Sequence, residues 1–465
     1  MSALALAARN VWRNGRRSLS TFLTMTVGVC ALLLLGAYVQ TVDQGLQTNF
    51  VRHGGHLEIQ HRDFLLYGDG NPAAYGLADY QRIIDAVRSD PQLRAQVLVI
   101  TPSLRLGGIA GNASANVSRT VFGRGTLVDD QNRMRAWNAY GLPIKPGNLA
   151  LQGSPPNAAV IGTGVARVLR LCGALAVPDC PPPVEAGAAG GAAQPAGLAA
   201  LSELSQPAKR TAMDAAVPVI QLLTAGETGA PNVADLNVVK AQSQGVKELD
   251  DGWIELHLAR AQRLVYGEAA PRATSLVVQL DTTANLAAAR ERIAAILARD
   301  FKGEQLTVLG FDTINPSYGQ ILGMFGALFG FVALLFSCVV LFSVANSVNM
   351  AVAERTVEIG TLRAIGMQRG AIAAVFVWEA LLLGLACAVA GLLLALGIAY
   401  AVNHAGMSWL PPGTVEPQVI SVGLWGEYKI IANAVLTLLI VSLLAAWWPA
   451  RRAGRLPIVD SLRHV

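Results

Sequence analysis

Four long apolar runs decide what this chain can fold into. A helix needs about 20 apolar residues to cross a bilayer, and all four runs reach that length: residues 19–41, 317–346, 371–402 and 430–449. Only 14% of the 465 residues are charged, against about 25% in an ordinary soluble domain. We therefore expect an α-helical membrane protein with four transmembrane helices and a large α+β extracytoplasmic domain between the first and the second.

The arginine residues indicate the orientation, because cytoplasmic segments of membrane proteins carry an excess of Lys and Arg. Three segments beside the runs contain arginine clusters, whereas the expected loop 403–429 offers only Lys429. The clusters are Arg9, Arg13, Arg16 and Arg17, then Arg355, Arg363 and Arg369, and finally Arg451, Arg452, Arg455 and Arg463. Both termini are therefore expected in the cytoplasm.

This orientation divides the rest of the chain between the two sides of the membrane. The expected cytoplasmic parts are an N-terminal helix (1–18), a polar segment (347–370), which the resemblance described below implies to be a coupling helix, and a tail (450–465). Residues 42–316 and the loop 403–429 are expected in the periplasm.

Two alternatives are weaker. The first run could belong to a cleaved signal peptide, but its apolar stretch is long for one and no clear A-x-A site follows it. We expect a retained anchor. The net charge of +5 could indicate nucleic-acid binding, but arginines beside apolar runs fit membrane orientation better, and no nucleic-acid partner is expected.

The two ends of the extracytoplasmic region carry alternating strand and helix patterns. HLEIQ, AQVLVITPSLRLGGIAG, SANVSRTVFGRG, SLVVQL and LTVLGF read as strands, and LADYQRIIDAVRSDPQLR and NLAAARERIAAILARDF as helices. We expect one subdomain built from both ends and a second formed by an insert at about 130–272. Residues 181–200 are rich in Ala, Gly and Pro, which predicts a mobile loop.

Two of the five cysteines lie outside the apolar runs. Cys172 and Cys180 have seven residues between them, and an oxidising periplasm permits a disulfide. Two free thiols are the alternative. Cys30, Cys338 and Cys387 fall within the runs, where we expect small apolar fillers.

Three histidines, His53, His56 and His61, follow the first run. Three imidazoles close together could bind a metal ion. However, His56 and His61 are five residues apart on an expected strand, so they point to opposite faces, and no metal site is expected. Neither G-x-S-x-G nor HExxH occurs, and no catalytic residue is expected.

Two features within the runs are unusual. Gly319, Gly323, Gly326 and Gly330 have the spacing that lets membrane helices approach closely. They predict a helix-packing face, within the chain or across a dimer; the alternative is that Gly is simply frequent in such helices. Glu379 lies inside the third run, where an ionisable side chain is costly. It serves either a function or a structural hydrogen bond.

The polar segment between the second and third runs is the main functional candidate. Glu354 and Glu358 share one helical face although like charges at this spacing repel, and a basic groove on a partner would use that arrangement. Arg355 and Arg363 could anchor the helix at the membrane surface or pair with the partner. The alternative is a solvated turn whose arginines reach the interface.

Three segments together resemble the FtsX-like permeases, the membrane subunits of the MacB, LolC/LolE and FtsX type of ABC transporter. ERTVEIGTLRAIGMQRGAI resembles their signature, ARNVWRNGRRSLST their N-terminal cytoplasmic helix and PARRAGRLPIVDSLRH their C-terminal tail. The resemblance covers about residues 1–60 and 275–465. The middle of the extracytoplasmic region shows none.

The resemblance implies a bacterial inner-membrane protein that pairs with a second permease, identical or a paralogue, above two ABC ATPase subunits. Six residues would contact the ATPase: Glu354, Arg355, Glu358, Ile359, Arg363 and Gly366. ATP and Mg would bind to that partner, and no cofactor is expected on this chain. Since no G-x-x-x-x-G-K-[ST] occurs, we expect that this chain is not an enzyme.

By the same resemblance, ATP hydrolysis would drive a periplasmic movement that transports an amphiphilic cargo, with lipoprotein release as the first hypothesis. A periplasmic carrier or adaptor and membrane lipids would be further partners. The alternatives are an FtsX-like mechanotransmission subunit that activates a cell-wall hydrolase, and a MacB-like exporter of small amphiphiles or peptides that works with an adaptor.

Overall fold

The structure is a computed structural model that describes residues 6–7, 9, 15–142, 147–178, 180, 217–410 and 418–457. The predicted loop 181–200, Arg13 and Arg463 lie outside the described residues, and so do the side chains of Arg16 and Arg17. Two compact units are present. One contains the chain up to Gly45 together with Ser317–Trp409 and the residues from Gln418 onward, and the other contains Leu46–Pro316 and Leu410.

Four helices of the first unit are long and apolar enough to cross a membrane. They are α2 (Gly15–Gly54), α14 (Pro316–Glu354), α16 (Arg369–Ala405) and α17 (Tyr428–Gly454). Each predicted apolar run lies inside one of them. The short helix α15 (Thr356–Ala364) lies between α14 and α16, and β10 (Ser408–Trp409) pairs with β11 (Gln418–Val419).

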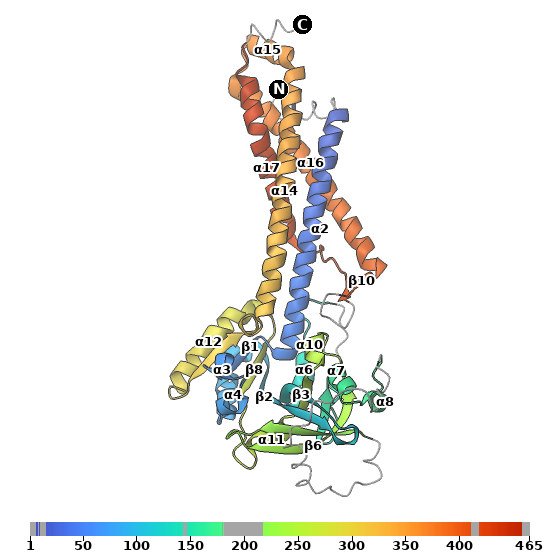
Figure 1. The fold of residues 1–465 in the computed structure, drawn as a ribbon. Coiled ribbons are helices and arrows are strands. Elements are labelled where there is room, and N and C mark those ends of the chain that lie inside the picture. The colour runs from blue at the N-terminus through green and yellow to red at the C-terminus, as the bar shows by residue number, and fades with distance from the viewer. Residues whose placement is uncertain are drawn as a thin grey trace. The chain divides into compact units, whose positions relative to one another are not determined.

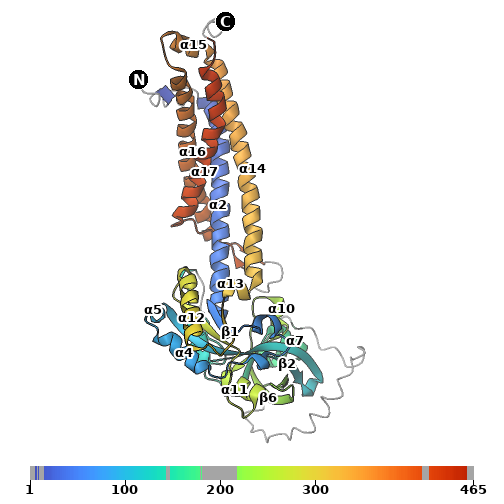
Figure 2. The same ribbon diagram turned by 90° about the vertical axis from the view of Figure 1, so that its left-hand side faces the viewer.

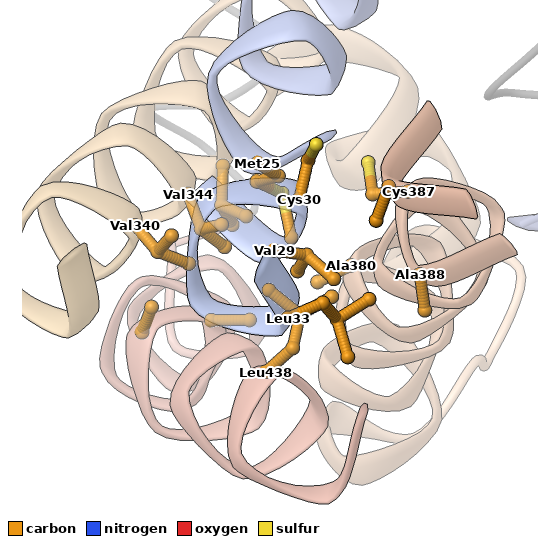
Figure 3. Close-up of a cluster of buried hydrophobic side chains, with 14 of the residues drawn as sticks. Met25, Val29, Cys30, Leu33, Val340, Val344, Ala380, Cys387, Ala388 and Leu438 are labelled. Atoms are coloured by element: carbon orange, nitrogen blue, oxygen red, sulfur yellow. The ribbon is translucent and has the colours of Figure 1, made fainter. Parts of the chain in front are cut away.

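Helix α2 supplies the centre of the helical core. Figure 3 shows its side chains Met25, Val29 and Leu33 against Val340 of α14 and Leu438 of α17. Residues of α16 complete the same cluster, among them Ala380, Cys387 and Ala388. The packing of these buried side chains holds α2, α14, α16 and α17 together.

Close helix contacts in this unit use glycines that the sequence pattern did not single out. A Cβ atom on Gly391 of α16 would lie 3.1 Å from the Cβ of Val29 and from the carbonyl oxygen of Thr26. One on Gly384 would lie 3.3 Å from the Oγ of Ser442 in α17. Small residues allow such approach between membrane helices.

The second unit is built on a nine-stranded sheet in the order β3-β7-β4-β6-β5-β2-β8-β1-β9. Figure 1 labels five of these strands: β1, β2, β3, β6 and β8. The strands are β1 (Leu57–His61), β2 (Val97–Asn112), β3 (Val117–Thr126), β4 (Ala158–Ile161), β5 (Val219–Ala225), β6 (Pro231–Ala241), β7 (Trp253–His257), β8 (Ser275–Leu280) and β9 (Leu306–Gly310). Most neighbours are antiparallel, but β3 with β7 and β4 with β6 are parallel.

Strand β2 connects two parts of this sheet. Its first half pairs with β8, from Val97 to Ser103. Its second half pairs with β5 and also with β3, so the strands β3, β7, β4, β6, β5 and β2 close into a ring. The insert expected at 130–272 therefore shares a sheet with the flanking strands and adds its strands to the far half of β2.

Each half of the sheet has its own apolar core. Helices α4 (Tyr80–Ser89) and α12 (Leu286–Asp300) lie side by side in both views (Figure 2) and cover β1, β2 and β8. Ile84 and Ile293 are among the buried side chains there. The ring encloses a second cluster with α7 (Thr163–Val168) and α11 (Leu258–Tyr266).

Short helices complete this unit. They are α3 (Phe64–Tyr67), α5 (Pro91–Arg94), α6 (Val128–Arg135), α8 (Cys172–Leu175), α10 (Lys247–Asp250) and α13 (Phe311–Ile314). Among them, α6 packs beside both β2 and the end of α2, and it thereby links the sheet to the last turn of that helix.

Candidate functional site

Helix α15 is held in place from its inner side. Arg355, just before the helix, is buried and its Nη1 lies 3.4 Å from Oε2 of Glu379 on α16. Ile359 is buried in the helical core. These contacts tie α15 to the helix that follows it, and the carboxylate of Glu379 pairs with an arginine of the same chain.

The far end of α15 is fixed to the C-terminal end of α17. Arg363 donates through Nη1 to the carbonyl oxygens of Gly454, at 3.3 Å, and Leu456, at 2.8 Å. Gly366 then takes a φ of +101°, which side chains disfavour, and the chain turns into α16. The separate helix is shorter than the predicted 347–370, because α14 continues to Glu354.

The outer face of α15 combines acidic and apolar side chains. Glu354 and Glu358 are exposed. Val357, Leu362 and Ile365 are exposed as well, Ile365 to 79%. The prediction did not include these three apolar residues, although they stand among its charged residues in the sequence. We call these five residues the α15 face.

A second arrangement lies at the end of α2. The last carbonyls of a helix have no partner within the helix. Here the backbone N–H of Gly55 donates to the carbonyl oxygen of Val51 at 2.9 Å, and side chains of the sheet supply further donors. Nε2 of Gln279, on β8, donates to the carbonyl oxygen of Val51 at 3.2 Å. Nη1 of Arg124, on β3, donates to that of His53 at 2.6 Å.

Helix α6 adds contacts from another side. Nε2 of Gln131 lies 3.4 Å from the carbonyl oxygen of Arg52, and Nε of Arg52 donates at 2.5 Å to the carbonyl oxygen of Arg135. Burial lowers the pKa of the Arg135 guanidinium. The negative end of a helix dipole favours cations at this position.

One carboxylate balances these arginines. Glu255 on β7 is 2% exposed in its side chain, and its Oε1 accepts from Nε of Arg124 at 3.2 Å and from Oγ1 of Thr126 at 3.3 Å. Its Oε2 lies 3.9 Å from Nη2 of Arg135. We call the last turn of α2 with Arg124, Gln131, Glu255 and Gln279 the α2 junction.

The comparisons with known proteins match the helical part first. Residues 330–458 match the model of the FtsX-like permease C-terminal domain, a stretch that contains α15, α16 and α17. This part of the chain therefore matches an FtsX-like permease C-terminal domain, which supports the predicted resemblance to FtsX/MacB-type permeases.

Individual relatives agree with the domain match. An uncharacterized ABC transporter permease, MJ1507, from Methanocaldococcus jannaschii is 25% identical over 49% of this permease and 54% of its own length. The macrolide export ATP-binding/permease protein MacB of Sodalis glossinidius is 28% identical over 40% of this chain and 27% of its own length. The ABC transporter permease YtrF of Bacillus subtilis is 28% identical over 29% of this chain and 31% of its own length. The permease thus matches about half or less of each relative's length.

The predicted packing glycines of the permease occupy an open face of α14. A Cβ atom on Gly319, Gly323, Gly326 or Gly330 would have no described atom within 4 Å, outside its own helix and chain neighbours. Large apolar side chains of the same helix are also exposed, Phe342 to 72%. The described residues of this chain therefore do not pack closely on these four glycines. Packing across a dimer and the simple abundance of Gly in such helices stay as the alternatives.

The remaining predicted residues lie in the sheet unit. Cys172 and Cys180 are joined in a disulfide, with 6.2 Å between their Cα atoms. No group of three His, Cys, Asp or Glu side chains is arranged for a metal ion among the described residues. His53, the first of the three histidines, instead places its Nδ1 2.9 Å from the carbonyl oxygen of Asn49.

His56 is fully buried beside the α2 junction. Its Nδ1 accepts from the backbone N–H of Leu280 at 3.0 Å, and its ring meets Trp137 edge to face at 5.1 Å. An Nδ1 that accepts this bond belongs to a neutral ring. Burial lowers the pKa of His56 from 6.5 to about 4.

This buried histidine predicts acid-sensitive stability. In the unfolded chain His56 takes up a proton below about pH 6.5, whereas the folded protein resists it down to about pH 4. The free energy of unfolding is therefore unaffected by His56 above about pH 6.5. As the pH falls from there to about 4, it decreases by up to about 1.4 kcal/mol for each pH unit. Thermal unfolding of the detergent-solubilised permease, followed by tryptophan fluorescence from pH 8 to about pH 4, measures the slope.

Two variants separate His56 from the rest of the chain. His56→Gln should unfold at a lower temperature at neutral pH but with a flatter pH dependence. His61→Gln changes a partly exposed histidine at the end of β1, the strand that follows His56, and should keep the wild-type slope. Parallel curves for wild type and His56→Gln would contradict the assignment.

Proposed function

We propose that this chain is the permease subunit of an ABC transporter in a bacterial inner membrane, with both termini in the cytoplasm. A separate ABC ATPase binds ATP and Mg, and its movement drives the sheet unit in the periplasm to move an amphiphilic cargo. Lipoprotein release is the first candidate, with a periplasmic carrier or adaptor as a further partner. The match to the FtsX-like permease C-terminal domain and the name of the MacB relative, an ATP-binding/permease protein, support this proposal.

The observation that carries it is the α15 face. A docking helix must expose side chains to its partner protein and be firmly bonded to the neighbouring helices of its own chain. Without those bonds it would shift by itself and would not transmit the movement of the partner to the other helices. Arg355 and Arg363 fix α15 to α16 and α17. The outward mixture of two carboxylates and three apolar side chains fits a groove on an ATPase that has basic walls and an apolar floor.

Charge reversal on this face tests the proposal. Glu354→Lys with Glu358→Lys places two cations where the ATPase groove is expected to be basic, and like charges across an interface are strongly unfavourable. Co-purified ATPase should fall by about tenfold or more, and ATP hydrolysis that depends on the permease should fall with it. Pull-down from membranes and phosphate release measure the two effects.

The matched control reverses two exposed carboxylates in the sheet unit. Glu268→Lys with Glu291→Lys makes the same change in net charge away from α15, and ATPase binding should stay at the wild-type level. If the α15 variant still binds the ATPase as wild type does, α15 is not the docking helix.

The α2 junction is the second part of the proposed mechanism. Helix α2 runs from Gly15 to Gly54 without a break, and its last carbonyls are bonded to side chains of β3, β8 and α6. Strand β1 starts three residues later. We assign to this junction the transfer of movement from the helix to the sheet.

Removing the guanidinium of Arg124 should uncouple the movement of the sheet from that of helix α2. Arg124→Gln deletes the guanidinium that joins the carbonyl oxygen of His53 to Glu255. We expect ATPase binding and hydrolysis to remain, while the ATP-dependent change in amide hydrogen exchange of β1 and β8 is lost. Exchange mass spectrometry on the permease–ATPase complex, with and without ATP, measures this.

Arg119→Gln is the control for this variant. Arg119 lies on the same strand, and its Nε donates to the carbonyl oxygen of Asp251, away from α2. It should keep the ATP-dependent exchange. An unchanged response in Arg124→Gln, or the same loss in Arg119→Gln, rejects a specific role for the junction.

A second copy of the permease, or a paralogue, completes the proposed assembly. The open glycine face of α14 is the surface that we assign to it, because small residues at this spacing allow two membrane helices to approach closely. The large exposed apolar side chains of α14 fit the same role or contact with lipid.

Bulky side chains on this face should block the pairing. At Gly323 and Gly330 an added Cβ would have no described atom within 4 Å outside its own helix and chain neighbours. Gly323→Leu with Gly330→Leu should therefore keep the fold, while cross-linked dimers in membranes fall severalfold. Gly397→Leu on α16, whose Cβ position is equally open, should leave the dimer yield unchanged. An undiminished yield in the α14 variant would remove this face from the interface.

A further inference from the structure

A groove in the sheet unit takes no part in ATPase docking at α15 or in the α2 junction. It is a cavity of about 580 Å³ between the end of α4, α5, the first residues of β2 and α6. This size lies within the range of about 300–1,000 Å³ that small-molecule sites occupy. We call it the arginine groove.

Its charge is positive. Arg88, Arg94 and Arg133 line it, and no carboxylate does among the described lining residues. Arg133 is paired with Asp130. Arg88 donates one N–H to the carbonyl oxygen of Ile100, at 3.3 Å, which fixes its guanidinium at the wall of the groove.

The carboxylate of Asp90, which lies between Arg88 and Arg94 in the sequence, is already engaged. Asp90 lies between α4 and α5, and its Oδ2 accepts from Nη2 and Nε of Arg292 at 2.7 and 2.9 Å. Its Oδ1 accepts from the backbone N–H groups of Gln92 and Leu93. These bonds hold the pKa of Asp90 below its usual range. Asp90 therefore does not neutralise Arg88 or Arg94.

The floor of the groove is apolar. It consists of the first four residues of β2, of which Leu98 is 55% exposed. A neighbouring cavity of about 350 Å³ shares Arg88 and Ile100 with it and adds the apolar residues Ile84, Leu127 and Leu258, together with polar residues that include Asp130 and Gln262. Its apolar residues extend the floor of the arginine groove, and the carboxylate of Asp130 is paired with Arg133.

We propose that the arginine groove binds an amphiphile with an anionic headgroup. Arg88 and Arg94 bind the headgroup, because guanidinium groups match phosphate and carboxylate oxygens in pairs. The alkyl chain lies on Leu98 and extends past Ile100 into the second cavity. This inference rests on the amphiphilic cargo of the proposed function and names its chemical class, but it does not require α15 to bind an ATPase.

The experiment uses the full chain in nanodiscs of phosphatidylcholine. The probe is dihexanoyl phosphatidic acid with a photoreactive diazirine on one acyl chain, and mass spectrometry maps the labelled peptides. We expect label within residues 87–100. Dihexanoyl phosphatidylcholine with the same diazirine should label this peptide about tenfold less, since the choline cation opposes the arginines.

Variants assign the two ends of the ligand. Arg88→Gln with Arg94→Gln should lower labelling by about tenfold, and Leu98→Gln, a change on an exposed side chain, should lower it as well. Arg263→Gln with Arg290→Gln removes the same charge from exposed positions on α11 and α12 and should leave the labelling unchanged.

Competitors distinguish the source of the anion. Decanoate should displace the probe, because it has both a chain and a charge, whereas inorganic phosphate at the same concentration should not. Displacement by phosphate alone would reduce the site to a simple anion site. Label confined to the membrane helices, or full labelling of the Arg88/Arg94 variant, would overturn the proposal. No ATPase is present, so this outcome is independent of the charge-reversal test on α15.

Discussion

The carbonyl groups at the end of α2 impose the constraint on which the sheet unit depends. A helix end has four carbonyls without an internal partner, and a buried one left unpaired costs about 1–3 kcal/mol. The backbone N–H of Gly55 donates to the carbonyl oxygen of Val51, which Gln279 on β8 also bonds. Gln131 on α6 and Arg124 on β3 supply donors to the carbonyls of Arg52 and His53. Glu255, almost fully buried, keeps the charge of Arg124 compensated. The last turn of α2 cannot rotate or slide without breaking several of these bonds at once.

The path of the chain extends this constraint through the sheet. Strand β1 follows α2 directly and lies between β8 and β9, antiparallel to both. Strand β9 in turn leads through α13 into α14. The two helices therefore join neighbouring positions in one sheet. Strand β8 is buried at every residue and pairs with β2, whose second half belongs to the ring, so displacement of β1 reaches the insert through hydrogen-bonded strands.

The local sequence pattern predicted many of the helices and strands. It did not predict which strands pair across long distances in the sequence. The four apolar runs and the flanking strands follow from composition and period, as in SLVVQL, which forms β8. The sharing of β2 by both halves depends on strand pairings across more than 100 residues, such as Gly108 with Thr224. The α2 junction joins Arg124 to His53 and Glu255, 71 and 131 residues away. In the sequence these residues show no periodicity that links them. Likewise Glu379 was recognised as unusual, while its partner Arg355 was assigned to the membrane surface or to another protein.

That ion pair explains how α15 gains a direction. A buried pair such as Arg355 with Glu379 contributes little net stability, because both groups lose hydration, but removing one partner leaves a buried charge and is costly. Apolar side chains at the two positions would let α15 rock against α16, since dispersion contacts are not directional. The pair, with the bonds from Arg363 to the end of α17, permits one orientation. In that orientation Ile359 is buried and Ile365 is exposed, and so the helix presents the same face to any partner that approaches it.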